Sequence, residues 1–287
     1  MTERTDAGAR RAFWARKMDE AHAFMQRVRQ QPVQECGEPL VSLVKATQAA
    51  GVEVEFSSKP HVLGLPRLYF LREGLIAPFL AAAREMLGRG WVMRIEDGFR
   101  TREMQRQLAR QPYTFDILLE RLRWELDGRP PTAQLVLRRM SALVANAPQV
   151  GTHMSGSAID ISVLDRARGC EIERGAPYIE LSELTPMDSP FVSPAAQDNR
   201  AAITDLMARH GFWAYPWEFW HYNSGDAYEA ILRGTDKLAR YGPVDMDPAT
   251  GTVLPILSSL EELNSLADFQ KMLELALRQS KTIRPKQ

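Results

Sequence analysis

The chain has 287 residues, of which 45% are hydrophobic and 25% charged, and its 36 Lys and Arg balance its 36 Asp and Glu. This is ordinary globular composition, and a neutral chain has no net field to attract nucleic acid or an acidic membrane. Cys36 and Cys170 match no zinc-finger spacing or disulfide framework, so we expect both to be reduced and structural. The N-terminus has no apolar run after its arginines and no later stretch approaches a membrane span, which predicts a cytoplasmic protein.

The first part of the chain predicts helices and short strands in mixed order. Apolar residues recur every three to four positions from about Ala9 to Arg29, as in an amphipathic helix that covers part of the core. Residues 52–56 alternate apolar and acidic side chains, and residues 67–71 are rich in β-formers, so both predict strands. A helix should follow from about Glu73 to Gly88, with a glycine close to its end.

The central part predicts one strand that leads into helices. Residues 90–100 read as a strand ending in a turn at Asp97–Gly98, after which Thr101 is placed to cap a helix. Arg100 is therefore expected at a strand-to-helix junction. Residues 113–147 predict two further helices without a chemical cluster, and we interpret them as an insertion.

The last part predicts two strands and two capped helices. Residues 157–164 are β-branched and apolar enough for a buried strand, and residues 212–223 predict a strand by their aromatic content. Between them Asp198 is expected to cap a helix that ends at His210–Gly211. Ser259 with Glu262 predicts a capping box before a C-terminal amphipathic helix. The mixed order, without regular βαβ alternation, favours an α+β fold.

Three side chains are candidate metal ligands. His153 lies in the small-residue run GTHMSGSAID, Asp160 is on the strand that follows, and His221 ends the stretch EFWH. Two imidazole nitrogens and one carboxylate oxygen suit a tetrahedral zinc that keeps its fourth position for water. One Zn²⁺ per chain is therefore expected, although this ligand set is compatible with other divalent metals.

Two further residues supply the groups that hydrolysis needs. Glu218, three residues before His221, can take the proton of an attacking water and pass it to the leaving amine. Arg100 is permanently charged and can stabilise an oxyanion. In a regular strand residues 218 and 221 would point to opposite faces, so we expect a bulge or turn near Pro216 to bring them together.

Other interpretations of these residues remain open at this point. A histidine near an aspartate is common by chance, and on spacing alone His153 suits a structural role as well. His22 on the first helix and His210 at a helix end are interpreted as structural. His61, in the segment SSKPHVLG, is either a loop residue or a substrate contact.

Two motifs resemble those of a known family. HMSGSAID resembles the SxHxxGxAxD signature, and EFWH the ExWH signature, of the D-alanyl-D-alanine dipeptidase (VanX-like) zinc peptidases. Further similar segments, such as EDGFR, extend the resemblance over roughly residues 56–226, the insertion excepted. The resemblance implies a central antiparallel sheet flanked by helices. It also implies zinc on His153, Asp160 and His221, Glu218 as general base and acid, and Arg100 beside the tetrahedral intermediate.

The sequence departs from the family at positions that bind substrate. The first serine of the signature is Gly151 here, and the acidic residue that pairs with the ammonium of the dipeptide falls at Val192. Asp188 in the same loop is the candidate replacement for that acid. Trp220, within the aromatic cluster of residues 212–222, is a candidate for lining the substrate pocket.

These inferences define one expected organisation. An α+β zinc D,D-peptidase domain spans residues 51–240, including the helical insertion at about 113–147. A helical extension at residues 1–50 packs on it, and a C-terminal extension with an amphipathic helix follows at 241–287. The oligomeric state is left open.

The expected activity is zinc-dependent hydrolysis of D-Ala-D-Ala or a related short peptide of D-amino acids, in bacterial cell-wall metabolism. The expected partner is this small peptide substrate, with no nucleic acid and no membrane. Two alternatives are a D,D-carboxypeptidase acting on longer muropeptides and a non-catalytic zinc-binding protein of the same fold.

Overall fold

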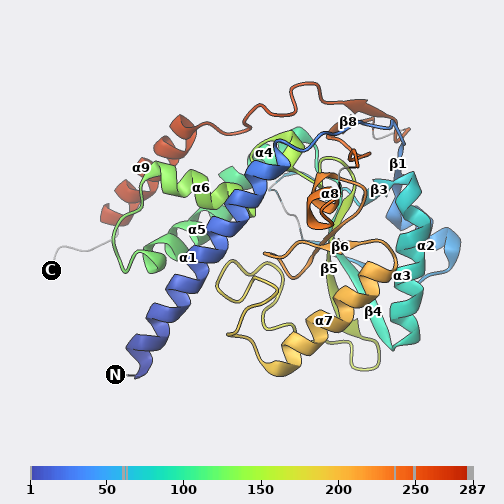
Figure 1. Ribbon diagram of the computed structural model, residues 1–287, viewed down its shortest axis with the longest axis horizontal. Coiled ribbons are helices and arrows are strands. Elements are labelled where there is room, and N and C mark those ends of the chain that lie inside the picture. The colour runs from blue at the N-terminus through green and yellow to red at the C-terminus, as the bar shows by residue number, and fades with distance from the viewer. Residues whose placement is uncertain (1, 60–61, 63, 236, 248–249, 283–287) are drawn as a thin grey trace.

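A five-stranded sheet forms the centre of the computed structural model (Figure 1), which describes residues 2–59, 62, 64–235, 237–247 and 250–282. The strands follow the order β2, β4, β5, β7, β6 across the sheet. Their bounds are Glu55–Phe56 (β2), Trp91–Asp97 (β4), Ala158–Asp165 (β5), Trp213–Ala214 (β6) and His221–Asn223 (β7). Every neighbouring pair is antiparallel except β2 with β4. The predicted α+β fold with a central antiparallel sheet is confirmed. Only β2 runs parallel to its neighbour, because a long helical crossover joins it to β4.

Three helices pack on one face of this sheet and bury the largest apolar core. They are α2 (Leu43–Ala50), α3 (Ile76–Gly88) and α7 (Pro194–Arg209). On β5 the side chains of Ile159, Ile161 and Val163 lie in this core. Because successive strand residues point to opposite faces, Asp160 and Ser162 lie on the other face of the sheet.

A second group of helices lies beside the sheet, on the left in Figure 1. Its members are α1 (Thr2–Val28), α4 (Arg102–Arg110), α5 (Pro112–Glu125), α6 (Ala133–Leu143) and α9 (Leu266–Thr282). The last four share a separate apolar cluster that includes Leu122, Met140 and Phe269. α1 packs on α5 and α6 and buries Trp14 and Met18 there. The helices expected at the N-terminus, in the insertion and near the C-terminus are all present, while the domain boundaries near residues 50 and 240 stay a prediction.

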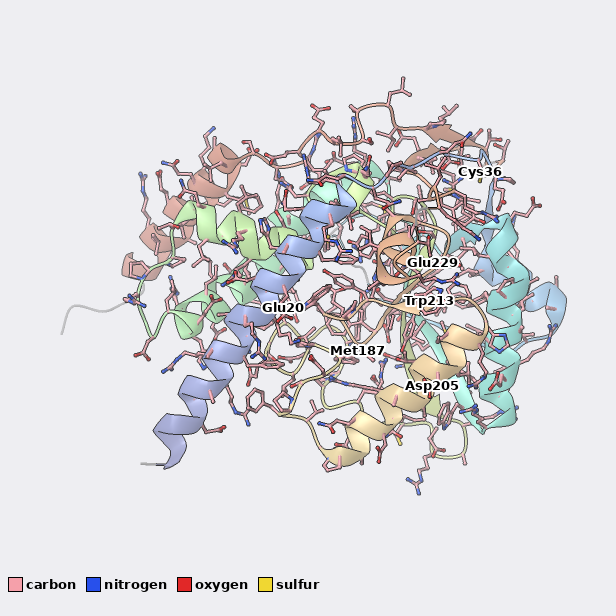
Figure 2. The ribbon with its side chains drawn as sticks, viewed as in Figure 1. Glu20, Cys36, Met187, Asp205, Trp213 and Glu229 are labelled. Atoms are coloured by element: carbon pink, nitrogen blue, oxygen red, sulfur yellow. The ribbon has the colours of Figure 1, made fainter. Side chains whose placement is uncertain are left out.

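Several short elements complete the fold. They are β1 (Leu40–Ser42), which pairs with β3 (Phe70–Arg72), β8 (Val244–Met246), which pairs with β9 (Val253–Pro255), the single turns η1 (Glu73–Leu75) and η2 (Pro148–Val150), and α8 (Ala227–Leu232). Cys36 and Cys170 are both free and exposed, and Cys36 is labelled near the rim of the molecule in Figure 2. Among the described residues, no helix combines the length and the apolar character that crossing a bilayer requires.

Two predicted helix starts were wrong by several residues. α7 begins at Pro194, and the Ser193 side chain, not Asp198, caps it by accepting from the backbone N–H of Ala196. Proline favours the first helical position because its fixed φ suits the helix and it has no N–H to satisfy. α9 begins after Ser265, not after Ser259, because Ser265 and Asp268 exchange the hydrogen bonds of a capping box.

Candidate metal centre

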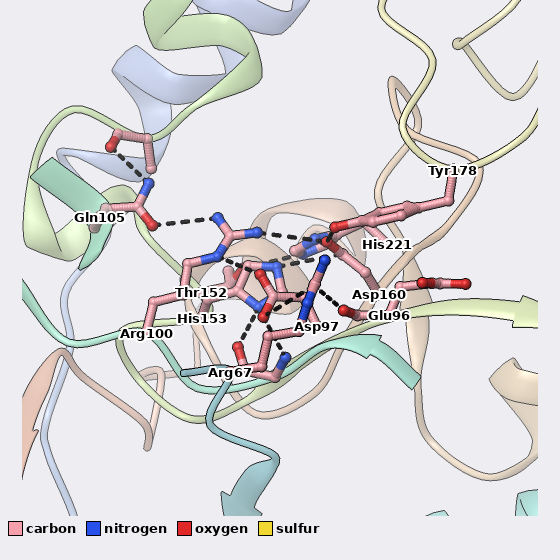
Figure 3. A network of polar contacts seen from close by, with 12 residues as sticks. Arg67, Glu96, Asp97, Arg100, Gln105, Thr152, His153, Asp160, Tyr178 and His221 are labelled. Carbon is pink, nitrogen blue, oxygen red and sulfur yellow. Dashed lines mark hydrogen bonds and ion pairs between the residues drawn. The ribbon is translucent and has the colours of Figure 1, made fainter. Parts of the chain in front are cut away.

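The structure brings the three predicted ligands together on the face of the sheet opposite the main core. Asp160 on β5 and His221 on β7 are directly paired across the antiparallel ladder, and His153 lies in the turn before β5. Asp160 Oδ1 is 3.2 Å from His153 Nε2 and 3.0 Å from His221 Nδ1. One donor atom from each residue lies within 4.8 Å of the others, and all three side chains are buried (Figure 3).

The second nitrogen of each imidazole is held by a group outside the cluster. His153 Nδ1 donates to the Gly98 carbonyl oxygen at 2.6 Å, and His221 Nε2 is 3.0 Å from the Thr152 hydroxyl. Position 98 suits glycine because a Cβ there would lie only 2.8 Å from the Leu68 carbonyl oxygen. Since a carbonyl only accepts, the proton of neutral His153 is on Nδ1, and its Nε2 lone pair points at the cluster.

This arrangement fits a cation. The His153 Nε2 lone pair and Asp160 Oδ1 are both acceptors at 3.2 Å, a contact that is stable when a proton or a metal ion lies between them. Burial lowers the pKa of His221, which favours the neutral imidazole that metals bind. Burial alone would raise the pKa of Asp160, but the electrostatic and hydrogen-bond interactions with His153 and His221 outweigh it and hold that pKa well below its usual range.

Arg100 lies at the predicted junction between β4 and α4, with its side chain directed at the cluster. Its Nε donates to Asp97 Oδ2 at 2.7 Å, its Nη1 to Gln105 Oε1 at 3.2 Å, and its Nη2 lies 3.5 Å from Asp160 Oδ2. Burial opposes its charge, but Asp97 and Asp160 raise its pKa above the usual value, so Arg100 stays protonated. A register shift in β4 between Ile95 and Asp97 places Asp97 opposite Asp160 in the ladder.

Glu218 reaches the cluster through the turn that the sequence required. Residues 212–223 do not form one strand: β6 ends at Ala214, and turns at 215–220 lead into β7. The backbone N–H of Glu218 donates to Tyr215 O at 3.2 Å, and that of His221 to Glu218 O at 3.2 Å. The Glu218 carboxylate is 4.0 Å from His221 Nδ1. The pKa of Glu218 is raised well above the usual value, mainly by burial and further by the nearby charge of Asp160.

A cavity that is partly open to solvent lies over these residues. Its lining includes the five residues predicted to act in catalysis or metal binding, together with Gly151 and Trp220. Asp188 does not line it: that carboxylate is 63% exposed and pairs with Lys17 on α1 at 2.7 Å. Val192 is also outside the lining and packs beside Gly175. His61 lies outside the described residues.

The structure adds three polar residues that the sequence analysis missed. Tyr178 donates to Asp160 Oδ2 at 3.2 Å, Gln105 accepts from Arg100, and Thr152 contacts His221. Burial raises the pKa of Tyr178 well above its usual value, so its hydroxyl stays a donor. Thr152 is adjacent to His153 in the motif and could have been suspected. Tyr178 and Gln105 have no local signal, because a loop and a helix far apart in sequence bring them in.

The site is of the kind found in catalytic metal centres: two imidazoles and one carboxylate converge, with a further carboxyl group and a guanidinium beside them. The family profile described as D-ala-D-ala dipeptidase (Peptidase M15) matches residues 130–237, a range that contains the three ligand candidates and Glu218. This match, together with two curated relatives, shows that the chain is similar to D-alanyl-D-alanine dipeptidases.

Two curated relatives carry the name D-alanyl-D-alanine dipeptidase. The protein of Escherichia coli (strain K12) is 32% identical over 97 residues, which span 33% of this chain and half (50%) of that protein. The protein of Synechocystis sp. is 26% identical over 244 residues, covering 75% of this chain and 95% of the relative.

Two solved structures were also found to be similar. One is the LdcB LD-carboxypeptidase, with 17% identity and a TM-score of 0.37, covering 71% of this chain and 77% of that one. The other is the vancomycin resistance D,D-pentapeptidase VanY in complex with Zn(II), with 16% identity and a TM-score of 0.34, covering 72% and 91%. At these values neither likeness bears on the function of this chain.

Proposed function

We propose that the chain is a zinc-dependent peptidase that hydrolyses the peptide bond of D-Ala-D-Ala or a related short peptide of D-amino acids. The observation that carries the proposal is the convergence of Glu218, a buried carboxyl with a raised pKa, on the cluster of His153, Asp160 and His221. A group that only stabilised the fold would have no need to be buried beside another carboxylate.

The proposed ligands are His153 through Nε2, Asp160 through its carboxylate and His221 through Nδ1. When bound there, zinc would supply a Lewis acid that polarises the substrate carbonyl and makes water a stronger nucleophile near neutral pH. The hydrogen bonds from the imidazoles to Gly98 and Thr152 would keep the ligating nitrogens aimed inward, as outer partners of metal-bound histidines do.

The remaining steps use the chain's own groups. The Glu218 carboxylate takes a proton from the attacking water and gives it to the leaving amine nitrogen, and its raised pKa strengthens it as a proton acceptor. The Arg100 guanidinium, held by Asp97 and Gln105, stabilises the negative charge that develops on the carbonyl oxygen. Tyr178 holds Asp160 Oδ2 by a hydrogen bond.

Replacement of Glu218 tests this mechanism directly. The Glu218→Gln variant keeps the size of the side chain and removes the proton acceptor, so it should bind zinc as the wild type does and lose about 10²–10⁴-fold in kcat. The measurements are zinc content and release of D-alanine from D-Ala-D-Ala, with zinc and after chelation. Hydrolysis at the wild-type rate by this variant would contradict the mechanism.

A second candidate function is a D,D-carboxypeptidase acting on longer peptides. It is favoured by the cavity lining, in which the only carboxylates among the described residues are Asp160 and Glu218. Both are assigned to the reaction, so neither is left to pair with the free ammonium of a dipeptide. A pentapeptide ending in D-Ala-D-Ala, compared with the free dipeptide, distinguishes the two activities.

A further inference from the structure

Part of the cavity is lined by apolar side chains from elements outside the sheet. They come from α5, from the end of α6 and from the loop after β5, and comprise Tyr113, Ile117, Leu143, Ile179 and Leu181; we call this set the apolar lining. All five are at least partly exposed, and Tyr113 is 71% exposed. When an apolar ligand covers apolar side chains that are open to solvent in a cavity, the burial of their surface favours binding.

The charges around the cavity are already engaged. The only cation in the described part of the lining is Arg100, which contacts Asp97, Gln105 and Asp160. Three acidic residues of the loop after β5 lie outside the lining and bind basic residues instead: Glu180 binds Arg121, Glu183 binds Arg10 and Arg121, and Asp188 binds Lys17. The apolar lining therefore offers no counter-ion to either charged end of a peptide.

We propose that the substrate is an N-acylated peptide whose residue on the amino side of the scissile bond has an apolar side chain larger than that of alanine. This inference rests on the proposed function. A free ammonium against the apolar lining would lose its hydration without gaining a partner, which is costly. The same holds for a terminal carboxylate, so the residue on the amino side is the one that lies against the lining. A methyl group would leave much of that lining uncovered.

A matched series of peptides tests the proposal with the zinc-loaded full chain. The substrates are N-acetyl-D-Leu-D-Ala, N-acetyl-D-Ala-D-Ala, N-acetyl-D-Lys-D-Ala and free D-Ala-D-Ala, and the readout is kcat/KM from released D-alanine. The leucine peptide should exceed the alanine peptide by at least about tenfold, since each methylene fitted into an apolar pocket contributes severalfold or more. The lysine peptide controls for length, because it is long but charged and should not gain.

Variants of the apolar lining should reduce this preference. Ile117→Ala and Leu181→Ala, on two separate elements, should each lower the ratio of kcat/KM for the leucine peptide to kcat/KM for the alanine peptide by about fivefold to tenfold. Asp116→Asn is the matched control, because Asp116 is the exposed neighbour of Ile117 and does not line the cavity. Unchanged zinc affinity shows that each variant is folded at the site.

The outcomes separate this inference from the proposed function. Preferred cleavage of N-acetyl-D-Leu-D-Ala, weakened in both lining variants and kept in Asp116→Asn, supports it. Equal or better cleavage of either alanine peptide overturns the inference and leaves the peptidase in place, as does a preference that neither variant changes. Failure of the wild type to cleave any of the four peptides overturns the proposed function, and the inference with it.

Discussion

Thr152 contacts the proposed metal ligand His221 through one hydrogen bond, between its hydroxyl and His221 Nε2. In Thr152→Val the imidazole loses this partner and Nδ1 is no longer held toward Asp160. Loss of an outer partner of this kind typically weakens metal affinity by about 10–100-fold. Thr152→Ser keeps the hydroxyl and should bind zinc as the wild type does. Competition with a chromophoric chelator measures both, and wild-type affinity in Thr152→Val would show that the bond is dispensable.

Asp226 predicts a pH dependence of stability. It accepts hydrogen bonds from Ser157, Asn223 and the start of α8, and burial raises its pKa to about 6 from the usual 3.8. Between about pH 4 and 6 the folded chain binds more protons at this carboxyl than the unfolded chain. Its contribution to stability is therefore full below about pH 4, declines as the pH rises to 6, and is constant above.

The Asp226→Asn variant should lack this decline. Asparagine has the same shape as aspartate and no charge to bury. The free energy of unfolding of the variant, relative to the wild type, should therefore rise by up to about 3 kcal/mol from pH 4 to pH 7, because a shift of two pKa units corresponds to about that much. Urea unfolding of both proteins at several pH values, with chelator present throughout, gives this difference. Parallel stability curves for the two proteins would contradict the expected shift.

At the scale of elements, α1 stabilises the helical half of the molecule. Trp14 on α1 is fully buried in a cluster that includes Met18 and Ala142, and Trp124 of α5 packs against it. Trp14→Ala should lower the free energy of unfolding by about 3–5 kcal/mol, as large-to-small changes of buried aromatic residues do. Arg16→Ala, two residues along with its side chain 63% exposed, should change it by less than about 0.5 kcal/mol. Chemical denaturation measures both, and similar effects would contradict the packing of α1.

The neighbouring strands β5 and β7 decide the geometry of the site. Pairing of Ala158 with Asn223 and of Asp160 with His221 fixes the register, and a slip by one residue would turn Asp160 into the apolar core. The turn at residues 215–220 then brings Glu218 to the same side as His221. Asp160 and His221 are far apart in the sequence and come together only once this ladder is formed.

At the scale of the whole molecule, the metal should tie separate segments together. The proposed ligands come from the turn before β5, from β5 and from β7, so zinc would bind the folded chain and not the unfolded one. Free zinc at about 1,000 times its Kd would stabilise the fold by about 4 kcal/mol. Chelation should therefore lower Tm, and added zinc should restore it. His153→Ala is the control that should show no such response, and a wild-type Tm indifferent to chelator would argue against a metal at this site.

The sequence by itself determined the α+β class, most helices and the identity of the five groups proposed for metal binding and catalysis. Local periodicity marks helices because an amphipathic helix needs one apolar face. Five residues with the required chemistry can be identified because their types occur in compact motifs: His153, Asp160, His221, Glu218 and Arg100. The helix starts at Ser193 and Ser265 were misplaced because several residues nearby can cap equally well.

Only the tertiary structure decided what surrounds those groups. Tyr178 and Gln105 reach the site from a loop and a helix far away in the sequence, and Asp188 turns away to Lys17 because α1 lies beside its loop. The apolar lining likewise joins residues from α5, α6 and a loop. Such contacts depend on how elements pack against each other, and no local pattern encodes which of many solvent-facing side chains a distant helix will cover.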